Sequence, residues 1–310
     1  MRAAKVLFMG TPAFACPSLE ALYEAGHEVC GVFTQPDKPK NRGMQLAPPP
    51  VKELALSHGT PVYQPGTLRD GEAANRIRAL APELIVVVAY GKILPKEILD
   101  IPPYGCINVH ASLLPKYRGA APIQWAILNG EEVTGTTIMH MDVGLDTGDI
   151  IAQAELEILQ DTAGELFHRL SLQGAKLLVN TIPAILDGTA KRIPQDHARA
   201  TNAPPLNRDM SPVDWSRRAE EIINQIQGLN PWPMATATFH DKIFKLHAAH
   251  VGANSVRPSS TPGTILSAGE AGLEIACGDG SVMITRLQAP DKKPMAAGEY
   301  LRGNPLVSSN

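Results

Sequence analysis

The chain has 310 residues, of which 44% are hydrophobic and 19% charged, and its formal net charge is -3. This composition excludes a disordered chain and a strongly basic nucleic-acid binder, and the lack of any apolar run near the ~18 residues of a membrane span predicts a soluble, cytoplasmic protein. The length exceeds what one hydrophobic core usually supports, so two domains are expected.

Strands and helices alternate through the first hundred residues. Apolar runs predict strands at 4–10, 31–35, 61–65 and 83–91, and helical spacing predicts the helices between and after them, at 13–25, 51–59, 72–81 and 95–101. The run LIVVVA in the fourth strand is apolar without alternation, which is typical of a parallel strand buried on both faces. The alternation predicts an α/β fold with a doubly wound, mostly parallel sheet and a ligand site at the carboxyl ends of its strands.

The next predicted strand, GCINVHAS at 105–112, sets Asn108, His110 and Ser112 at alternate positions near such an end. An amide can donate to a developing oxyanion, and an imidazole can move protons near neutral pH. A carboxylate to complete this chemistry is missing locally. The turn VGLDTGD, which also follows a predicted strand, offers the nearest candidates, Asp142, Asp146 and Asp149.

The pattern of predicted elements changes along the rest of the chain. A helix at 121–130, strands at 136–142 and 150–158 and a long helix at 162–187 complete a first domain, predicted at 1–189. An irregular stretch predicts a linker at 190–210. After a helix near 216–228, short strands broken by Gly and Pro predict a small β-barrel domain at 211–310.

Two loops allow more than one interpretation. Gly10-Thr11-Pro12 follows a strand, but it lacks the G-x-G-x-x-G and Walker patterns, so we favour a structural turn over a nucleotide site. The loop QPDKPKNRGMQ at 35–45 carries Lys38, Lys40 and Arg42. It is either a solvated loop or an arm that contacts phosphates.

Metal and nucleophile sites are weakly supported. His110, His140 and an aspartate could bind a metal, but their spacing matches no metal motif, and His140 is interpreted as structural. Ser112 sits in no G-x-S-x-G elbow, and Cys106 lies inside a strand, where a structural thiol is expected. The four cysteines are widely spaced and are expected to be reduced.

Two separated blocks, Asn108 to Gly119 and Asp142 to Asp149, resemble the signature of the folate-dependent formyltransferase family. The resemblance implies a Rossmann-like domain that moves a formyl group from 10-formyltetrahydrofolate, its co-substrate, to an amine, without a metal. It implies Asn108, His110 and Asp146 as catalytic residues. It also implies a folate-binding set: Ser112, Leu113, Leu114, Pro115, Val88, Ala89, Tyr90, Gly91, Ile93, Leu94, Asp142 and Gly144. Arg118 is a landmark without an assigned role.

Residues 5–190 resemble the members of this family that formylate initiator methionyl-tRNA for translation initiation, and sparser landmarks such as Asp214-Trp215 and NPWP at 230–233 continue the likeness. In those members an OB-like second domain helps to hold tRNA. The implied tRNA-binding residues are Lys38, Lys40, Arg42, Arg208, Lys292 and Lys293. The usual linker Lys-x-x-Lys is absent, since Pro205 and Arg208 stand near its positions. Residues 188–310 hold only 13 Lys+Arg against 11 Asp+Glu, so salt-sensitive binding is expected.

Other acceptors stay open at this stage. The same site could serve a sugar-nucleotide amine, a glycinamide or, in a hydrolase, water. A non-catalytic RNA-binding protein with an inactive formyltransferase fold is a further alternative, and the intact Asn108, His110 and Asp146 count against it. A monomer is expected.

Overall fold

The computed structural model describes residues 2–40, 45–253 and 260–306. The chain divides into two compact units. The first contains Met1–Ala120, Val133–Glu157 and Phe167–Ala203, and the second contains Ala121–Glu132, Ile158–Leu166 and Pro204–Asn310. The predicted linker at 190–210 is therefore shared between the units, with its residues up to 203 packed into the first.

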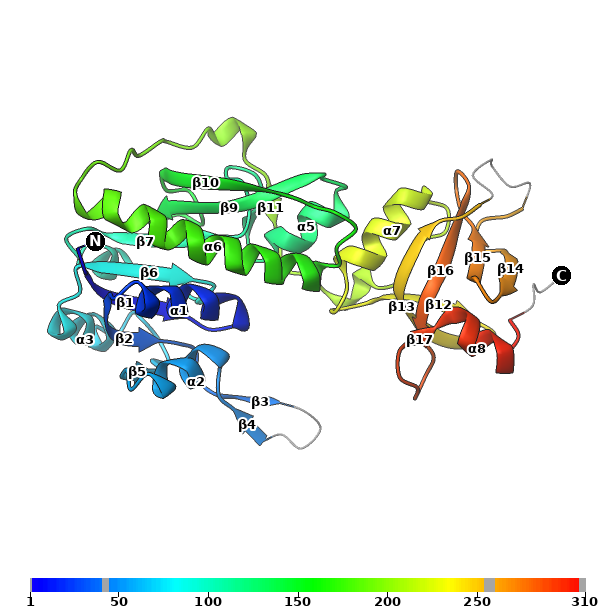
Figure 1. Cartoon of the computed structure of the whole chain (residues 1–310), viewed down its shortest axis with the longest axis horizontal. Coiled ribbons are helices and arrows are strands. Elements are labelled where there is room, and N and C mark those ends of the chain that lie inside the picture. Colours follow the sequence, from blue (N-terminus) through cyan, green and yellow to red (C-terminus); the bar gives the residue numbers. More distant parts are fainter. Residues whose placement is uncertain (1, 41–44, 254–259, 307–310) are drawn as a thin grey trace. The chain divides into compact units, whose positions relative to one another are not determined.

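A seven-stranded sheet forms the centre of the first unit (Figure 1). Its order is β10-β9-β7-β6-β1-β2-β5, parallel from β7 to β5 and antiparallel at β9 and β10. The bounds are β1 (Lys5–Gly10), β2 (Glu28–Phe33), β5 (Val62–Tyr63), β6 (Leu84–Val88), β7 (Cys106–His110), β9 (Val133–His140) and β10 (Ile150–Glu157). The predicted doubly wound, mostly parallel sheet is confirmed.

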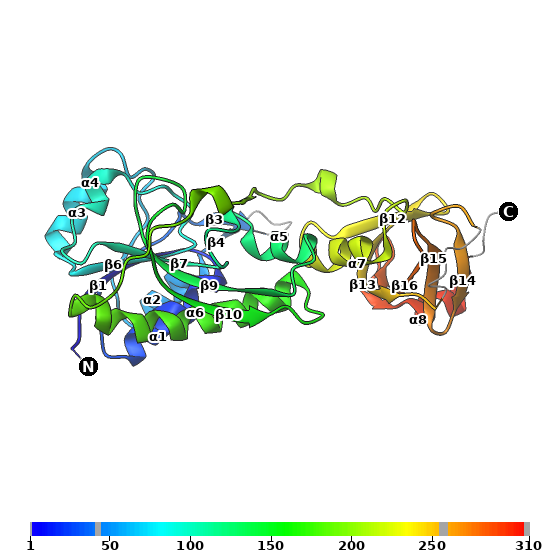
Figure 2. The same cartoon turned by 90° about the horizontal axis from the view of Figure 1, so that it is seen from above.

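Helices cover both faces of this sheet, with α1 and α6 on one side and α3 and α4 on the other (Figure 2). They are α1 (Cys16–Glu24), α2 (Pro50–Ser57), α3 (Glu72–Leu80), α4 (Lys96–Leu99) and α6 (Ala163–Leu186). Ile77 of α3 and Ile98 of α4 pack with Ile85 and Val87 of β6. All five residues of β6 are buried, because helices remove water from both of its faces.

The strand order also locates the ligand edge. The chain passes from β1 outward to β2 and β5 and then returns to β6 on the other side of β1. The loops after β1 and β6 therefore diverge at the carboxyl edge, the topological switch point where open α/β sheets bind ligands. The segment after β7 leaves the same edge, because β7 is parallel to β6.

The second unit is a small antiparallel β domain, as predicted. Its strands pair in the order β12-β13-β16-β15-β14, with β17 on β16. Ile222 and Ile226 of its helix α7 pack with Phe244, Leu246 and Val282 of the sheet. Its elements are α5 (Pro122–Leu128), α7 (Ala219–Gly228), β12 (Ala235–Phe239), β13 (Lys242–Val251), β14 (Ile265–Gly269), β15 (Gly272–Ala276), β16 (Ser281–Gln288), β17 (Met295–Ala296) and α8 (Ala297–Gly303). In the described part of the chain, no helix combines the length and apolar character needed to span a bilayer.

Several short elements were not predicted from the sequence. β3 (Lys38–Lys40) and β4 (Gln45–Ala47) form a hairpin, and β8 (Arg118–Gly119) pairs in parallel with β11 (Asn202–Ala203). The others are β17, α8 and the 3-10 turns η2 (His197–Arg199) and η3 (Arg208–Met210), while the 3-10 turn η1 (Ala13–Ala15) begins the helix predicted at 13–25. Strands of two or three residues have no measurable hydrophobic period, so only tertiary pairing reveals them.

Gly174 tests the close packing of α6 on the sheet. A Cβ at Gly174 would lie 2.8 Å from Val109 Cγ1, so a leucine there must push the helix away from β7. We expect Gly174→Leu to lower the free energy of unfolding of the first unit by about 1–3 kcal/mol through overpacking. Hydrogen exchange of the β7 and β9 amides measures this. Gly303→Leu is the control, because a Cβ at Gly303 meets no atom within 4 Å.

Candidate active site

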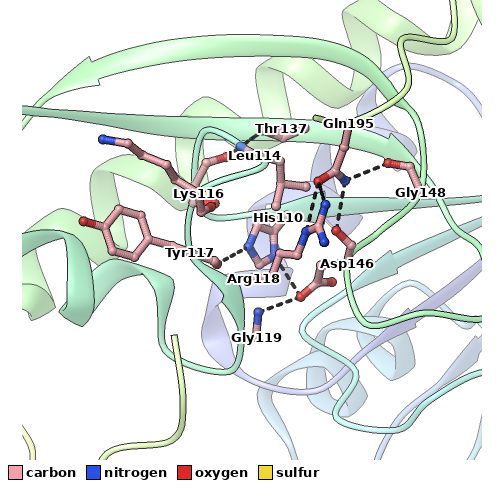
Figure 3. A network of polar contacts seen from close by, with 11 residues as sticks. His110, Leu114, Lys116, Tyr117, Arg118, Gly119, Thr137, Asp146, Gly148 and Gln195 are labelled. Atoms are coloured by element: carbon pink, nitrogen blue, oxygen red, sulfur yellow. Dashed lines mark hydrogen bonds and ion pairs between the residues drawn. The ribbon is translucent and has the colours of Figure 1, made fainter. Parts of the chain in front are cut away.

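His110 is the last residue of β7, and its imidazole is buried between two polar neighbours (Figure 3). Its Nε2 lies 2.9 Å from the carbonyl oxygen of Tyr117. Because a carbonyl oxygen can only accept, Nε2 carries a proton and donates it. This hydrogen bond fixes the tautomer and leaves Nδ1 as the nitrogen that can gain or lose a proton.

The carboxylate of Asp146 lies on the Nδ1 side of the imidazole (Figure 3). Asp146 Oδ2 is 3.8 Å from His110 Nδ1, and the same oxygen accepts a 2.9 Å hydrogen bond from the backbone N–H of Gly119. The 3.8 Å separation is within ion-pair range but too long for a direct hydrogen bond. A small polar group can therefore bridge Nδ1 and Oδ2.

Asn108 precedes His110 by two residues in β7, so both side chains project from the same face of the sheet. Cys106, two residues earlier still, packs against Ile77 and Ile98, which identifies this as the face covered by α3 and α4. The Asn108 side chain is half-buried and forms no hydrogen bond with any residue that the structure describes. Its amide is available to a ligand.

The turn between β9 and β10 that carries Asp146 is closed by its own side chains. Asp142 Oδ1 accepts hydrogen bonds from the Gly144 N–H at 2.9 Å and from the Thr147 hydroxyl at 2.6 Å. A Cβ at Gly144 would lie 2.0 Å from Thr147 Oγ1, so the turn needs glycine there. Asp146 itself has a φ of +53°, a left-handed conformation that aspartate tolerates better than most residues.

The route by which Asp146 reaches His110 differs from the one expected. The sequence interpretation placed the turn beside His110 because both follow strands. However, β9 runs antiparallel to β7 and pairs His140 with Ile107, so the turn begins beside the earlier part of β7. Residues 141–149 must extend back along β7 to bring Asp146 to His110.

Two buried residues that sequence reasoning left without a role connect this turn to the segment after β7. Gln195 Nε2 donates hydrogen bonds to the backbone oxygens of Asp146 at 2.9 Å and Gly148 at 2.7 Å. Gln195 Oε1 accepts from Arg118 Nε at 3.1 Å and Nη2 at 2.6 Å. Arg118 Nη2 is also 3.1 Å from His197 Nδ1. Gln195 belongs to no motif, and only the fold reveals it.

The first predicted folate segment, residues 112–115, is held by a compact set of hydrogen bonds. The Ser112 hydroxyl donates to the Lys116 carbonyl at 2.6 Å, and the Thr137 hydroxyl donates to the Ser112 carbonyl at 2.6 Å. The Leu114 N–H donates to Thr137 Oγ1 at 3.1 Å. Ser112 is fully buried, so its side chain shapes the segment and leaves contact with a ligand to its neighbours.

The second predicted folate segment, residues 88–94, is anchored through its backbone. The Tyr90 carbonyl accepts hydrogen bonds from the Thr11 hydroxyl at 3.0 Å and from Gln35 Nε2 at 3.1 Å. Burial raises the pKa of the Tyr90 phenol to about 12, so this side chain stays neutral. Ile93 points outward with 62% of its surface exposed. The loop thus presents an apolar side chain on a fixed backbone.

The residues predicted to bind tRNA lie in both units. Lys38 is exposed at the start of the β3–β4 hairpin, Lys40 ends β3, and Arg42 lies outside the described residues. The other three are exposed in the second unit: Arg208, Lys292 and Lys293.

His140, considered as a metal ligand with His110, has a structural environment. A Cβ at Gly105 would lie 2.3 Å from His140 Nε2, so the ring packs directly on that backbone. Burial lowers the pKa of His140, and Arg192 lowers it further. Among the residues that the structure describes, no group of three or more His, Cys, Asp or Glu is arranged to hold a metal ion.

Together, a free amide, an imidazole with one free nitrogen and a carboxylate lie at the carboxyl edge of a parallel sheet. Such a set suits a reaction in which negative charge develops on an oxygen while a proton moves nearby.

Comparisons with known proteins agree with this architecture. A family model described as formyl transferase matches residues 4–182, and a second, described as formyl transferase, C-terminal domain, matches residues 205–305. Methionyl-tRNA formyltransferases of Acetivibrio thermocellus and Clostridium novyi are each 50% identical to this chain over 97% of its length, covering 96% and 97% of the relatives.

Solved structures share the fold at lower identity. An N-formyltransferase from Helicobacter canadensis, in complex with folinic acid and dTDP-3-aminofucose, aligns with a TM-score of 0.69 at 22% identity over 92% of this chain and 99% of that one. HypX from Aquifex aeolicus, in complex with tetrahydrofolic acid, aligns with a TM-score of 0.65 at 16% identity over 97% of this chain. The present chain spans about half the length of HypX, 47%.

Cys106 provides a test of the site without substrate. All four cysteines are free thiols, and burial raises the pKa of the Cys106 thiol to about 12. At pH 8 we expect iodoacetamide to modify the half-buried Cys16 and Cys30 first and Cys106 only after unfolding, as followed by mass spectrometry. Rapid modification of Cys106 in the native protein would instead identify a reactive thiolate in β7.

Proposed function

The chain belongs to the formyl transferase family, and from this we propose that it transfers the formyl group of 10-formyltetrahydrofolate to the free amino group of the methionyl residue on initiator methionyl-tRNA. Methionyl-tRNA is proposed as the acceptor because the chain is 50% identical to curated methionyl-tRNA formyltransferases over 97% of its length, which includes both units. The product is N-formylmethionyl-tRNA, which starts translation.

Asn108 is proposed to act on the formyl oxygen. Attack of the methionyl amine on the formyl carbon forms a carbon–nitrogen bond and places negative charge on that oxygen. The Asn108 amide, half-buried and without an internal partner among the described residues, can donate to it. Removal of one such donor typically lowers kcat about 10²–10³-fold.

His110 and Asp146 are proposed to act on the attacking amine, whose positive charge and proton must be removed as the reaction proceeds. Because Nε2 is bonded to the Tyr117 carbonyl, Nδ1 is the nitrogen available to the reaction. The attacking amine loses a proton, and the folate nitrogen N10 must gain one when its bond to the formyl carbon breaks. Asp146 Oδ2, 3.8 Å from Nδ1, is placed to relay that proton through a bridging water, with protonated His110 as its ion-pair partner.

The chemistry of the surrounding surface fits a folate. Ile93 of the 88–94 segment is exposed at 62%, and Val143 and Leu145 of the turn between β9 and β10 are exposed at 67% and 60%. A flat pterin ring packs well between such side chains, while backbone groups of residues 88–94 bind its polar edge. Residues 112–115 leave the same edge of the sheet.

The basic residues are proposed to hold the tRNA. Lys38 is exposed in the first unit, and Lys292 and Lys293 are exposed in the second. Lys40 and Arg42 complete the proposed set from the sequence. The lysine-poor linker offers only Arg208 near the expected positions. Few cationic contacts imply modest affinity with a clear salt dependence. We further propose that the enzyme works as a monomer in the cytoplasm, since one chain supplies all three catalytic residues and initiation occurs there.

The central test uses labelled 10-formyltetrahydrofolate with methionyl-tRNA or with buffer as acceptor. We expect label in the tRNA fraction for the wild-type protein and a loss of at least about 100-fold in kcat for His110→Ala. The variant removes the ion-pair partner that supports proton transfer by Asp146, and such transfer contributes about 10²–10⁴-fold. His168→Ala, which removes an exposed imidazole from α6 in the same unit, should match the wild type.

The two arms of this assay separate the alternatives. Folate release in buffer without transfer to tRNA would identify a hydrolase. No reaction in either arm would support a non-catalytic binding protein, and a near-normal rate for His110→Ala would refute the role given to that residue.

Arg42 gives a test of the acceptor. Arg42→Ala is expected to raise the KM for methionyl-tRNA about tenfold and to leave the KM for the folate unchanged, because the lost contact is to phosphate and not to the pterin. Arg78→Ala is the charge-matched control, since Arg78 pairs with Glu97 on the surface formed by α3 and α4. Equal loss with a minimal amine acceptor would contradict the proposed role of Arg42.

A further inference from the structure

We propose that Gln195 is a positioning residue that holds Asp146 opposite His110, with Arg118 as its anchor. The inference rests on the proposed function, because it assigns a catalytic role to Asp146. Gln195 is separated from Asp146 by 49 positions and from Arg118 by 77, and it comes from the segment that follows α6.

The Gln195 amide has no unused hydrogen-bonding capacity (Figure 3). Its two N–H groups donate to the carbonyl oxygens of Asp146 and Gly148, and its oxygen accepts two N–H groups of Arg118. An amide rotated by 180° would set donors against the guanidinium and an acceptor against the carbonyl oxygens, so one orientation is favoured. With 6% of its surface exposed, Gln195 makes these bonds away from water, where a lost partner is costly.

The Asp146 backbone needs such support. Its φ of +53° is a left-handed conformation that few residues other than glycine adopt. Gln195 fixes the carbonyl of this residue, and the Gly119 N–H fixes its Oδ2. Held at both points, the carboxylate keeps its 3.8 Å separation from His110 Nδ1.

The same segment also sets the position of His110. The Tyr117 N–H donates to Thr201 Oγ1 at 2.9 Å and the Arg118 N–H donates to the Thr201 carbonyl at 2.8 Å. Tyr117 in turn provides the carbonyl that accepts the His110 Nε2 proton. Residues 195–203 therefore act on the imidazole through Tyr117 and on the carboxylate through Gln195.

Arg118 makes one substitution especially informative. Its guanidinium is buried, and no described residue provides a carboxylate partner. Gln195→Glu would give Arg118 a charge-assisted pair and so keep the anchor. The new carboxylate would also replace two donors with an acceptor that repels the carbonyl oxygens of Asp146 and Gly148. The variant thus removes the hydrogen bonds to the Asp146 turn while it keeps the contact with Arg118.

Gln225 supplies a matched control in the second unit. It is similarly buried, and its Nε2 donates to two backbone oxygens, those of Met210 at 2.8 Å and Pro212 at 3.0 Å. Gln225→Glu also loses two amide N–H donors, but these do not contact Asp146. Gln195→Met and Gln225→Met form a second pair that lacks the new charge, for use if a glutamate variant fails to fold.

The kinetic test compares kcat and KM for formyl transfer to methionyl-tRNA. We expect Gln195→Glu to lower kcat about 10- to 100-fold, since a misplacement near 1 Å can cost about 10²-fold, with both KM values within about twofold of the wild type. Gln225→Glu should retain the wild-type kcat. A Gln195→Glu kcat within threefold of the wild type, or a change confined to KM, would overturn the proposal.

A second readout needs no activity. Hydrogen exchange of the Gly119 amide, followed by NMR, reports its bond to Asp146 Oδ2, and Asp146→Ala gives the value for its loss. Exchange in Gln195→Glu should approach the Asp146→Ala value, whereas Gln225→Glu should match the wild type. Wild-type exchange in Gln195→Glu would overturn the proposal. If the wild-type protein fails to formylate tRNA while these shifts occur, the proposed function fails and the positioning of Asp146 by Gln195 stands.

Discussion

The hydrogen bond from His110 Nε2 to the Tyr117 carbonyl is the constraint on which the site depends. A main-chain carbonyl can only accept, so it keeps the proton on Nε2 and holds the imidazole in one orientation. In the proposed mechanism, Nδ1 is therefore the nitrogen that takes part in the reaction, and the proton moves in the gap between Nδ1 and Asp146. Tyr117 holds the imidazole side of that gap, and Gly119 and Gln195 hold the Asp146 side.

Much of the scaffold could be predicted because its signals are local. The run LIVVV alone predicts that β6 is a buried parallel strand. The alternation of side chains along β7 predicts that Asn108 and His110 lie on one face. Glycines in the 142–149 turn mark a tight bend. The proposed catalytic trio came from resemblance to a family, which carries information on tertiary contacts that residue spacing does not contain.

The parts that escaped prediction depend on chain direction and on distant partners. The sequence of β9 does not indicate whether the strand runs parallel or antiparallel to β7. The end of β7 beside which the Asp146 turn begins could therefore not be predicted. Gln195 is one glutamine in an aperiodic stretch, and its importance comes from the carbonyl oxygens and the guanidinium that surround it. Polar residues of this kind carry no hydrophobic period, so local pattern cannot find them.

The segment from 195 to 203 has a consequence for where this protein can be divided. The two family-model matches end at 182 and begin again at 205, and a change of composition near 189 suggests a similar cut. A fragment ending at either 182 or 189 would keep Asn108, His110 and Asp146 but lose the Gln195 and Thr201 contacts. A fragment that keeps these contacts must therefore extend to residue 203. The stretch between the two family-model matches, up to that residue, belongs structurally to the first unit.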